Sequence, residues 1–175
     1  MKTFIFSLIL LGLTTFSKAQ NGKEYVDLAE QKAKVGDYSS AIILLDKAEQ
    51  EGATDIYCNR AYYKQMANDF QGALKDYDIC VERSSIYVKI QLIVARAKLK
   101  LKMKDFNGVI SDCTQALEIS DKYAEALFYR AEAKKALGDL PGACEDYKKA
   151  AVLENFRSHE GLDFFISARK KNCGE

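Results

Sequence analysis

Four stretches of the chain repeat one pattern of apolar and polar positions. In each, a short turn leads into an aspartate, an apolar residue follows, and a run of helix-forming residues comes next. The four turns are Gly36-Asp37-Tyr38, Asn68-Asp69-Phe70, Lys104-Asp105-Phe106 and Gly138-Asp139-Leu140. The steps from one aspartate to the next are 32, 36 and 34 residues, and a period in this range indicates stacked helical hairpins.

Small residues recur at two fixed places in this pattern. When each repeat is numbered so that its turn aspartate is position sixteen, the repeats start at Gly22, Thr54, Ile90 and Ala124. Positions eight and twenty are then held by Ala29, Ala61, Ala97 and Ala131, and by Ala41, Ala73, Val109 and Ala143. Small side chains at matching places on two successive helices let the backbones approach closely, so each repeat is predicted to be an antiparallel helical hairpin.

The turn residues fit the ends of these helices. Aspartate is a favourable N-cap for the second helix, and Gly36 and Gly138 suit a left-handed end of the first helix. Pro141 falls in the first turn of its helix, where its missing N–H costs nothing. Residues 98–104 alternate with period two, but the register of the other repeats predicts helix there.

An arginine and an aspartate sixteen residues apart recur in the last three repeats. Positions seven and twenty-three are Arg60 with Asp76, Arg96 with Asp112, and Arg130 with Asp146. In the first repeat both are replaced together, by Leu28 and Leu44. Joint replacement predicts that the two positions meet as structural pairs, because arginine and a carboxylate form a bidentate ion pair. The alternative is a row of arginines that grips an anion.

These repeats resemble those of the tetratricopeptide repeat (TPR) family. The run from Ala124 to Asn155, AEALFYRAEAKKALGDLPGACEDYKKAAVLEN, is similar to that family's repeat from end to end, and the resemblance covers roughly residues 22–156. It implies an all-α fold, a right-handed α-solenoid of four TPR-like helical hairpins. The repeats would be about 22–53, 54–87, 90–123 and 124–156, within one repeat domain over 20–156.

A terminal repeat needs a cap over its apolar flank. Leu162, Phe165 and Ile166 lie on one helical stripe, so residues 157–175 are predicted to form a C-terminal capping helix and tail. A docking helix for a partner is the alternative.

The N-terminal residues have the pattern of an export signal. Lys2 precedes a mainly apolar stretch over 4–13, and Ser17 and Ala19 place small residues at a cleavage site. This stretch is shorter than the roughly 20 residues of a membrane-spanning helix. We predict a signal peptide over 1–19, an exported chain (periplasmic or secreted) and no membrane insertion after cleavage. An uncleaved anchor is the alternative.

Charge argues against nucleic acid as a partner. The chain has 26 basic and 25 acidic residues, and residues 1–19 hold two of the lysines and no acid. A nucleic-acid-binding domain is typically strongly basic. Residues 86–104 carry six cations and no acid; a solvated face is predicted there, with a weak site for an acidic peptide or lipid headgroup as the alternative.

Candidate chemistry is sparse. The five cysteines include no C-x-x-C pair, so no metal site is predicted. Cys80 and Cys113 are expected to be buried free thiols, while pairing among the other cysteines stays open. A Cys–His nucleophile would need a thiol beside the single histidine, His159, and no glycine-rich phosphate loop occurs. We therefore expect no catalytic residue, no cofactor and no enzyme activity.

Binding is the function that the resemblance implies. First helices of the family line a concave groove, which gives nine partner-binding candidates: Val26, Glu30, Asn59, Tyr62, Val94, Lys98, Phe128, Tyr129 and Glu132. Rigid aromatic side chains beside polar groups suit peptide recognition, although the aromatics could instead contact the adjacent repeat. The family's carboxylate clamp is not implied, because only Asn59 matches its five positions. We predict a non-enzymatic scaffold that binds an unknown peptide or protein in the groove; the alternative is a self-associating structural protein of the cell envelope.

Overall fold

The structure is a computed structural model that describes residues 20–153, 167, 170–171 and 173. The predicted signal peptide over 1–19 and most of the predicted cap over 157–175 lie outside these residues. Every regular element in the described part is a helix. The prediction of an all-α fold is therefore confirmed.

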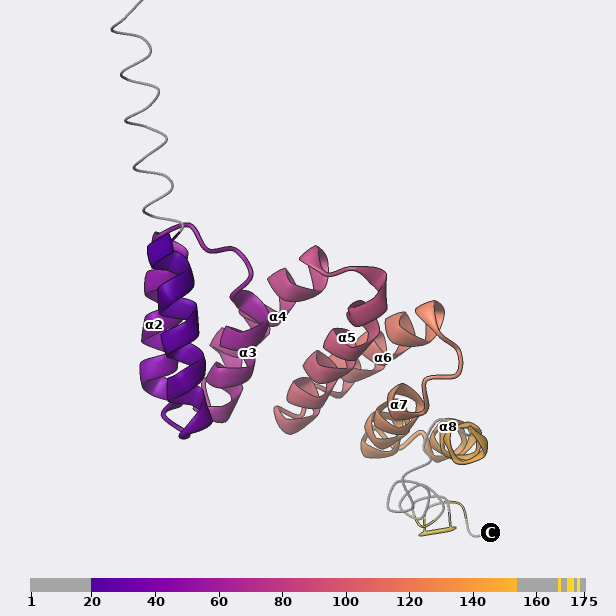
Figure 1. Ribbon diagram of the computed structural model, residues 1–175. Coiled ribbons are helices and arrows are strands. Elements are labelled where there is room, and N and C mark those ends of the chain that lie inside the picture. Colours follow the sequence, from indigo (N-terminus) through magenta and orange to yellow (C-terminus); the bar gives the residue numbers. More distant parts are fainter. Residues whose placement is uncertain (1–19, 154–166, 168–169, 172, 174–175) are drawn as a thin grey trace, which may run out of the picture. The chain divides into compact units, whose positions relative to one another are not determined.

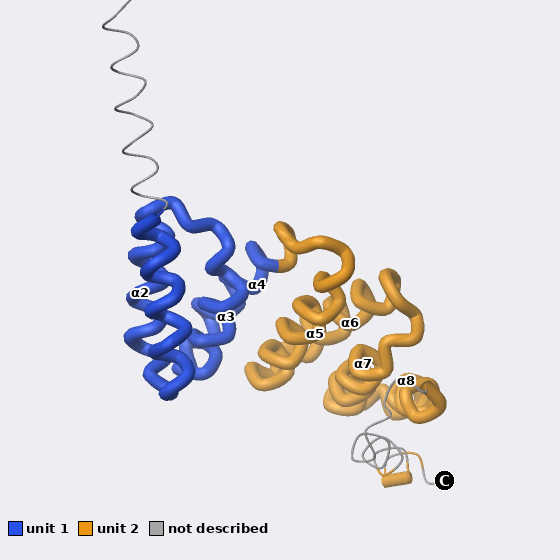
Figure 2. Tube along the Cα trace, in the orientation of Figure 1, with its two compact units in different colours: residues 1–80 blue, residues 81–175 orange. Residues whose placement is uncertain are grey.

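The helices fall into two compact units, residues 1–80 and 81–175 (Figure 2). Unit 1 contains a helix over 20–34, α2 (Tyr38–Gln50), α3 (Tyr57–Met66) and α4 (Phe70–Arg83) as far as Cys80 (Figure 1). Unit 2 contains the end of α4, then α5 (Ile86–Lys102), α6 (Phe106–Ile119), α7 (Ala124–Ala136) and α8 (Leu140–Val152).

Within each unit, helices that follow one another in the chain pack together. In unit 1, α2 contacts α3, and in unit 2 the contacts run from α5 to α6, α6 to α7 and α7 to α8. The first helices α5 and α7 also contact each other. This is the arrangement of an α-solenoid, in which each hairpin buries its apolar flank on its neighbour.

The two helices of every repeat are joined by a turn of the same local geometry. The residue before the turn aspartate has a positive φ in all four repeats: Gly36 (81°), Asn68 (64°), Lys104 (62°) and Gly138 (87°). Glycine adopts this conformation freely, whereas for Lys104 it costs roughly 1 kcal/mol. The aspartate side chains accept hydrogen bonds from the backbone N–H groups of Ser40, Gly72, Gly108 and Gly142. The predicted N-caps are confirmed, and Pro141 lies in the first turn of α8.

The small residues at positions eight and twenty lie at close helix crossings. Seven of these eight side chains are 0% exposed, and Ala143 is 1% exposed. Unit 1 has one apolar core cluster, around Ala29, Ala41 and Leu45. Unit 2 has two, of which one surrounds Val109 and the other Tyr147. The predicted close approach of the paired helices is thus present in both units.

Four of the five cysteines form disulfides. Cys58 on α3 is bonded to Cys80 on α4, and Cys144 on α8 is bonded to Cys173. The prediction of a free thiol at Cys80 is therefore wrong: position five of a hairpin lies beside position twenty-seven, which brings the Cα atoms of Cys58 and Cys80 within 5.2 Å. Cys113 is free and buried, as predicted.

Candidate functional site

Bidentate ion pairs join the two helices of each of the last three hairpins. In each pair, Nε and Nη2 of the arginine donate to the two carboxylate oxygens of the aspartate. The distances are 2.8 and 2.9 Å for Arg60–Asp76, 3.0 and 2.8 Å for Arg96–Asp112, and 2.8 and 2.7 Å for Arg130–Asp146. The three aspartates are at most 3% exposed. The structure brings together each arginine and aspartate that the sequence predicts to meet.

A lysine one helical turn after each arginine completes these groups. The Nζ atoms of Lys64, Lys100 and Lys134 lie 2.8, 2.9 and 2.8 Å from the same aspartates. Each buried carboxylate is therefore paired with two cations, and Lys134 also donates a hydrogen bond to Asp146. The predicted pairing did not include these lysines, although they follow the arginine by four residues in all three repeats.

Arg60 and Arg130 also link their hairpin to the preceding one. Nη1 of Arg60 donates to Asp46 at 2.8 Å and to Glu49 at 2.6 Å, both on α2. Nη1 of Arg130 donates to Thr114 on α6 at 3.3 Å. The hydrogen bond from Arg60 lowers the pKa of Glu49 below its usual value, because it favours the charged carboxylate. These contacts make the arginines internal cross-links and do not favour the alternative of a row that grips an anion.

In unit 1, the predicted partner-binding residues differ in how far they reach solvent. Glu30 and Tyr62 are exposed, and Tyr62 keeps 47% of its surface. Val26 and Asn59 are half-buried, and Val26 packs against the apolar core of unit 1. Glu30 and Tyr62 are therefore the side chains of this set that a partner reaches first.

Tyr62 belongs to a cluster of three tyrosines that spans the junction of the first two repeats. Its ring centre lies 6.4 Å from that of Tyr38 on α2 and 6.0 Å from that of Tyr63 on α3. Tyr38 and Tyr63 were not among the predicted site residues. They could have been found only from the packing of α2 on α3, because no sequence period relates them to Tyr62.

In unit 2, two of the predicted partner-binding residues are buried in the core. Val94 is 1% exposed and lies in the same cluster as Cys113. Phe128 is 7% exposed, and its ring packs against those of Tyr129 and Tyr147 at 5.4 and 5.9 Å. Both stand at position five, where the side chain packs on the second helix of its hairpin. Both side chains are therefore part of the core of unit 2.

Lys98 and Tyr129 form a contact between the first helices α5 and α7. The Nζ atom of Lys98 lies 3.2 Å from a carboxylate oxygen of Glu125 and 5.5 Å from the centre of the Tyr129 ring. The second distance is within the range of a cation–π interaction. Burial alone would lower the pKa of Lys98, but Tyr129 and Glu125 outweigh it and raise the pKa. The lysine is therefore charged.

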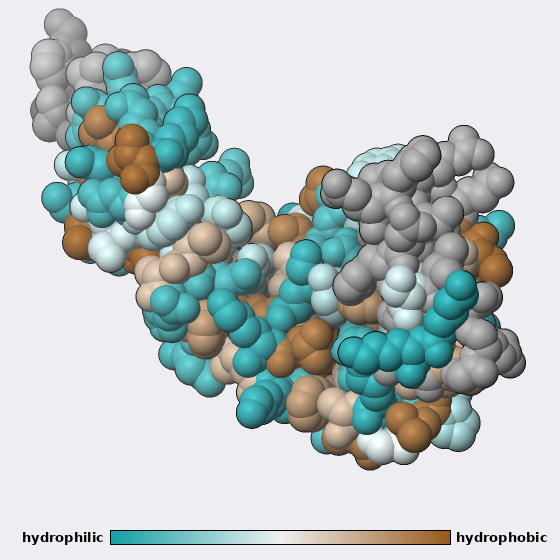
Figure 3. Space-filling model, turned by 90° about the horizontal axis from the view of Figure 1, so that it is seen from below, coloured by the Kyte–Doolittle hydropathy of each residue, from teal (hydrophilic) through white to brown (hydrophobic). Residues whose placement is uncertain are grey.

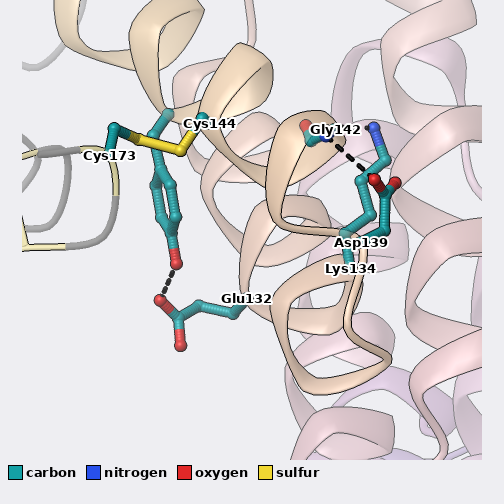
Figure 4. Close-up of a disulfide and its surroundings, with 7 residues drawn as sticks. Glu132, Lys134, Asp139, Gly142, Cys144 and Cys173 are labelled. Atoms are coloured by element: carbon teal, nitrogen blue, oxygen red, sulfur yellow. Dashed lines mark hydrogen bonds between the residues drawn. A yellow bond between two sulfur atoms is a disulfide. The ribbon is translucent and has the colours of Figure 1, made fainter.

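Glu132 is engaged inside its own hairpin. The hydroxyl of Tyr147 donates a hydrogen bond to it, and Nζ of Lys135 lies 3.0 Å from both of its oxygens. Burial, and then the bond to Glu132, raises the pKa of Tyr147. The Cys144–Cys173 disulfide lies beside this contact (Figure 4). Glu132 thus ties α7 to α8.

The described surface has few other features that point to a ligand. In the ranges that the structure describes, no three metal-ligating side chains gather, and no helix is long and apolar enough to cross a membrane. Figure 3 shows one face, on which apolar side chains are scattered among polar ones. The exposed apolar residues include a consecutive set at the start of α5, Ile86, Tyr87 and Val88, which are 54%, 87% and 44% exposed.

Part of the chain is similar to curated proteins. No family model matches it. It is 33% identical over 67 residues to the human mitochondrial import receptor subunit TOM70, and 38% identical over 69 residues to RNA polymerase II-associated protein 3 of Xenopus tropicalis. Each match covers 38% of this chain but only 11% and 10% of the relatives' own lengths.

Solved structures extend the likeness over most of the chain. A tetratricopeptide repeat protein from Parabacteroides merdae matches with a TM-score of 0.73 and 20% identity, over 89% of this chain and 61% of that one. The MamA protein matches with a TM-score of 0.69 and 14% identity, over 89% and 87%. At such identities the likeness establishes the fold alone. Taken with hairpins that recur every 32 to 36 residues and pack in chain order within each unit, it shows that the chain has the fold of tetratricopeptide-repeat proteins.

Proposed function

We propose that the protein is a non-enzymatic scaffold that binds a peptide or another protein on the outward faces of its first helices. The TPR fold suggests protein–protein interaction, and position nine of the repeat supports this proposal most strongly. It is occupied by Glu30, Tyr62, Lys98 and Glu132, directly after the buried alanine of position eight. The first three of these are exposed. Position nine therefore presents a different charged or aromatic side chain in successive repeats. Such variation is expected of a surface that recognises a specific partner.

The contacts around these residues favour a partner with both polar and apolar groups. Tyrosine is a frequent anchor in protein interfaces, because it buries a large rigid ring and keeps a hydroxyl for hydrogen bonding. Tyr62 in unit 1 and Tyr129 in unit 2 fill this role, and Asn59 and Lys98 add polar groups near them. A peptide backbone with alternating side chains suits such a mixed surface.

Two features support binding outside the cytoplasm. Residues 1–19 have the pattern of a signal peptide. The fold contains two disulfides. Disulfides persist in oxidising compartments such as the periplasm and the extracellular space. The scaffold would then act in the cell envelope or beyond it.

Site-specific photo-crosslinking tests the proposed surface. Benzoylphenylalanine is placed at Asp27 or Gln91, which are exposed on first helices next to the candidate residues, and at Lys75 or Gln115 as matched controls on the second helices α4 and α6. In extracts of the native source, adducts should form from the first-helix positions and be absent from the controls. Adducts that form only from Lys75 or Gln115 would contradict the proposal.

Self-association is a second candidate, favoured by the exposed set of Ile86, Tyr87 and Val88. Apolar side chains exposed together are typical of interfaces. Light scattering on the purified chain separates the two functions: a mass that stays at one chain as concentration rises contradicts self-association. Adducts between two copies of the chain would support it.

A further inference from the structure

Tyr38, Tyr62 and Tyr63 bring three aromatic rings together in unit 1. The distances between ring centres are 6.4 Å for Tyr38–Tyr62 and 6.0 Å for each of the other two pairs. Tyr63 is 8% exposed, whereas Tyr62 is 47% exposed. The Tyr62 ring lies at 89° to the ring of Tyr38 and at 63° to the ring of Tyr63, so a single cation lies over the face of one ring at a time. The exposed ring of Tyr62 is the one that offers a cation–π contact to a partner.

Glu30 adds a negative charge next to this cluster. Burial, and then the charge of Glu30, raises the pKa of Tyr63, so the carboxylate lies within electrostatic range of the Tyr63 hydroxyl. Within the described residues, no lysine or arginine pairs with Glu30 and none lies over the three tyrosine rings. The electrostatic environment is thus suited to a positive charge that the described part of the chain does not supply.

Unit 2 shows what such groups do when a cation is present. There the ammonium group of Lys98 lies 5.5 Å from the centre of the Tyr129 ring and 3.2 Å from Glu125. Burial opposes the charge of this lysine, but Tyr129 and Glu125 outweigh it and raise the pKa of the lysine. In unit 1, Tyr62 and Glu30 offer the same two groups on the protein surface.

The repeat itself does not require the tyrosine cluster. Tyr38 stands at position seventeen of its repeat, and Tyr62 and Tyr63 stand at positions nine and ten of the next. The corresponding positions of the third and fourth repeats hold Phe106, Glu132 and Ala133. Since α6 and α7 pack on each other without three tyrosines, the cluster is a property of this surface and not of the fold.

We propose that Tyr38, Tyr62 and Glu30 bind a lysine or arginine side chain of the partner polypeptide. This inference rests on the proposed function, because it assigns a residue type to one position of the bound peptide. The basic side chain lies over the exposed ring of Tyr62, its apolar stem packs against Tyr38, and Glu30 attracts its charge. Tyr63 supports the two other rings from below.

Selection of short random peptides displayed in a library, with the purified full chain as bait, tests the site without knowledge of the natural partner. The selected peptides should share a lysine or arginine at a fixed position. Replacing that residue by norleucine keeps an alkyl chain and removes the charge, and should weaken binding about tenfold. Tyr62→Leu should weaken binding by about the same factor, whereas Tyr62→Phe should bind like the parent because it keeps the ring.

Matched variants separate recognition from folding. Glu30→Gln should weaken binding about threefold, and the loss should shrink at high salt. Tyr87→Ala removes another exposed tyrosine, 87% exposed in unit 2, and should leave affinity unchanged. Circular dichroism spectra equal to the parent's show that each variant is folded.

The outcomes distinguish this inference from the proposed function. Selected peptides that share no basic residue, or that bind equally well with norleucine, would overturn the cation site and leave the scaffold proposal standing. Equal binding by Tyr62→Leu and the parent would do the same. A library that yields no binding peptide would contradict both.

Discussion

Asp146 is the residue whose replacement tests the buried ion pairs most sharply. Its side chain is 1% exposed and accepts hydrogen bonds from Arg130 at 2.8 and 2.7 Å and from Lys134 at 2.8 Å. Asp146→Asn keeps the size of the side chain and removes its charge. Arg130 and Lys134, whose side chains are 18% and 21% exposed, then lose the counter-charge that they share.

The loss in the free energy of unfolding depends on how deeply the ion pair is buried. Breaking one side of a fully buried ion pair costs about 3–5 kcal/mol. Because both cations keep some contact with water, we expect a loss of about 2–3 kcal/mol in the free energy of unfolding. For a chain of this size, that lowers the melting temperature by roughly 5–10 °C, as measured by circular dichroism.

A neighbouring residue provides the control for this measurement. Glu145 is exposed and pairs with Lys149 one turn away, so Glu145→Gln should melt at the parent's temperature. The triple variant Arg130→Met/Lys134→Met/Asp146→Leu removes all three charges of the group and should recover most of the lost stability. A parent-like melting temperature for Asp146→Asn would refute the reasoning.

The stability difference between the parent and Asp146→Asn should depend on pH. Burial alone would raise the pKa of Asp146, but the hydrogen bonds from Arg130 and Lys134 outweigh it and hold the pKa below its usual value. The stabilisation is therefore fully present above the unfolded value of about 4 and is lost as pH falls through the folded value. The parent's advantage over Asp146→Asn should shrink on acidification, and a gap that does not change with pH would contradict this account.

Three further outcomes follow from the packing and the cysteines. Ala131→Asp places an unpaired charge at a helix crossing that is 0% exposed, so it should cost several kcal/mol; an unchanged melting temperature would contradict that placement. In denaturant, thiol titration should find one thiol, Cys113, without reductant and all five cysteines after reduction; three or more thiols without reductant would contradict the disulfides. Burial raises the pKa of Cys113 to about 12, so iodoacetamide should fail to modify it in the folded protein at mildly alkaline pH; rapid alkylation would show that the thiol is accessible.

Features that repeat at fixed positions were the predictable ones. The pairing of Arg60 with Asp76 could be predicted from the sequence because both positions change together in the first repeat. The positive φ before the turn aspartate was predictable at the two glycines, but Lys104 adopts it too. There the aspartate cap and the packing of α5 on α6 determine the turn, and they override the local preference of lysine.

The disulfide in unit 1 could have been predicted from the register of the hairpin, but not from each cysteine taken alone. In an antiparallel hairpin, the register that places position seven beside position twenty-three also places position five beside position twenty-seven. Cys58 and Cys80 occupy those two positions. Burial of a cysteine between helices was predictable from composition, whereas its partner follows only from the hairpin register.

The candidate site was harder to predict. A residue's position in the repeat gives the helix face on which it lies, but not how exposed its side chain is. Val94 and Phe128 stand at a position assigned to the groove, yet both are buried against the second helices. Contacts such as Tyr38–Tyr62 depend on how one hairpin lies on the next. That geometry comes from packing and has no signature in the period.

The central claim is that a partner binds on the first helices of the repeats. Amide chemical-shift changes in the isotope-labelled chain, on addition of a bound peptide, test it most directly. The account predicts that the largest changes fall in the helix over 20–34 and in α3, α5 and α7, near position nine. Changes confined to α2, α4, α6 and α8 would contradict it.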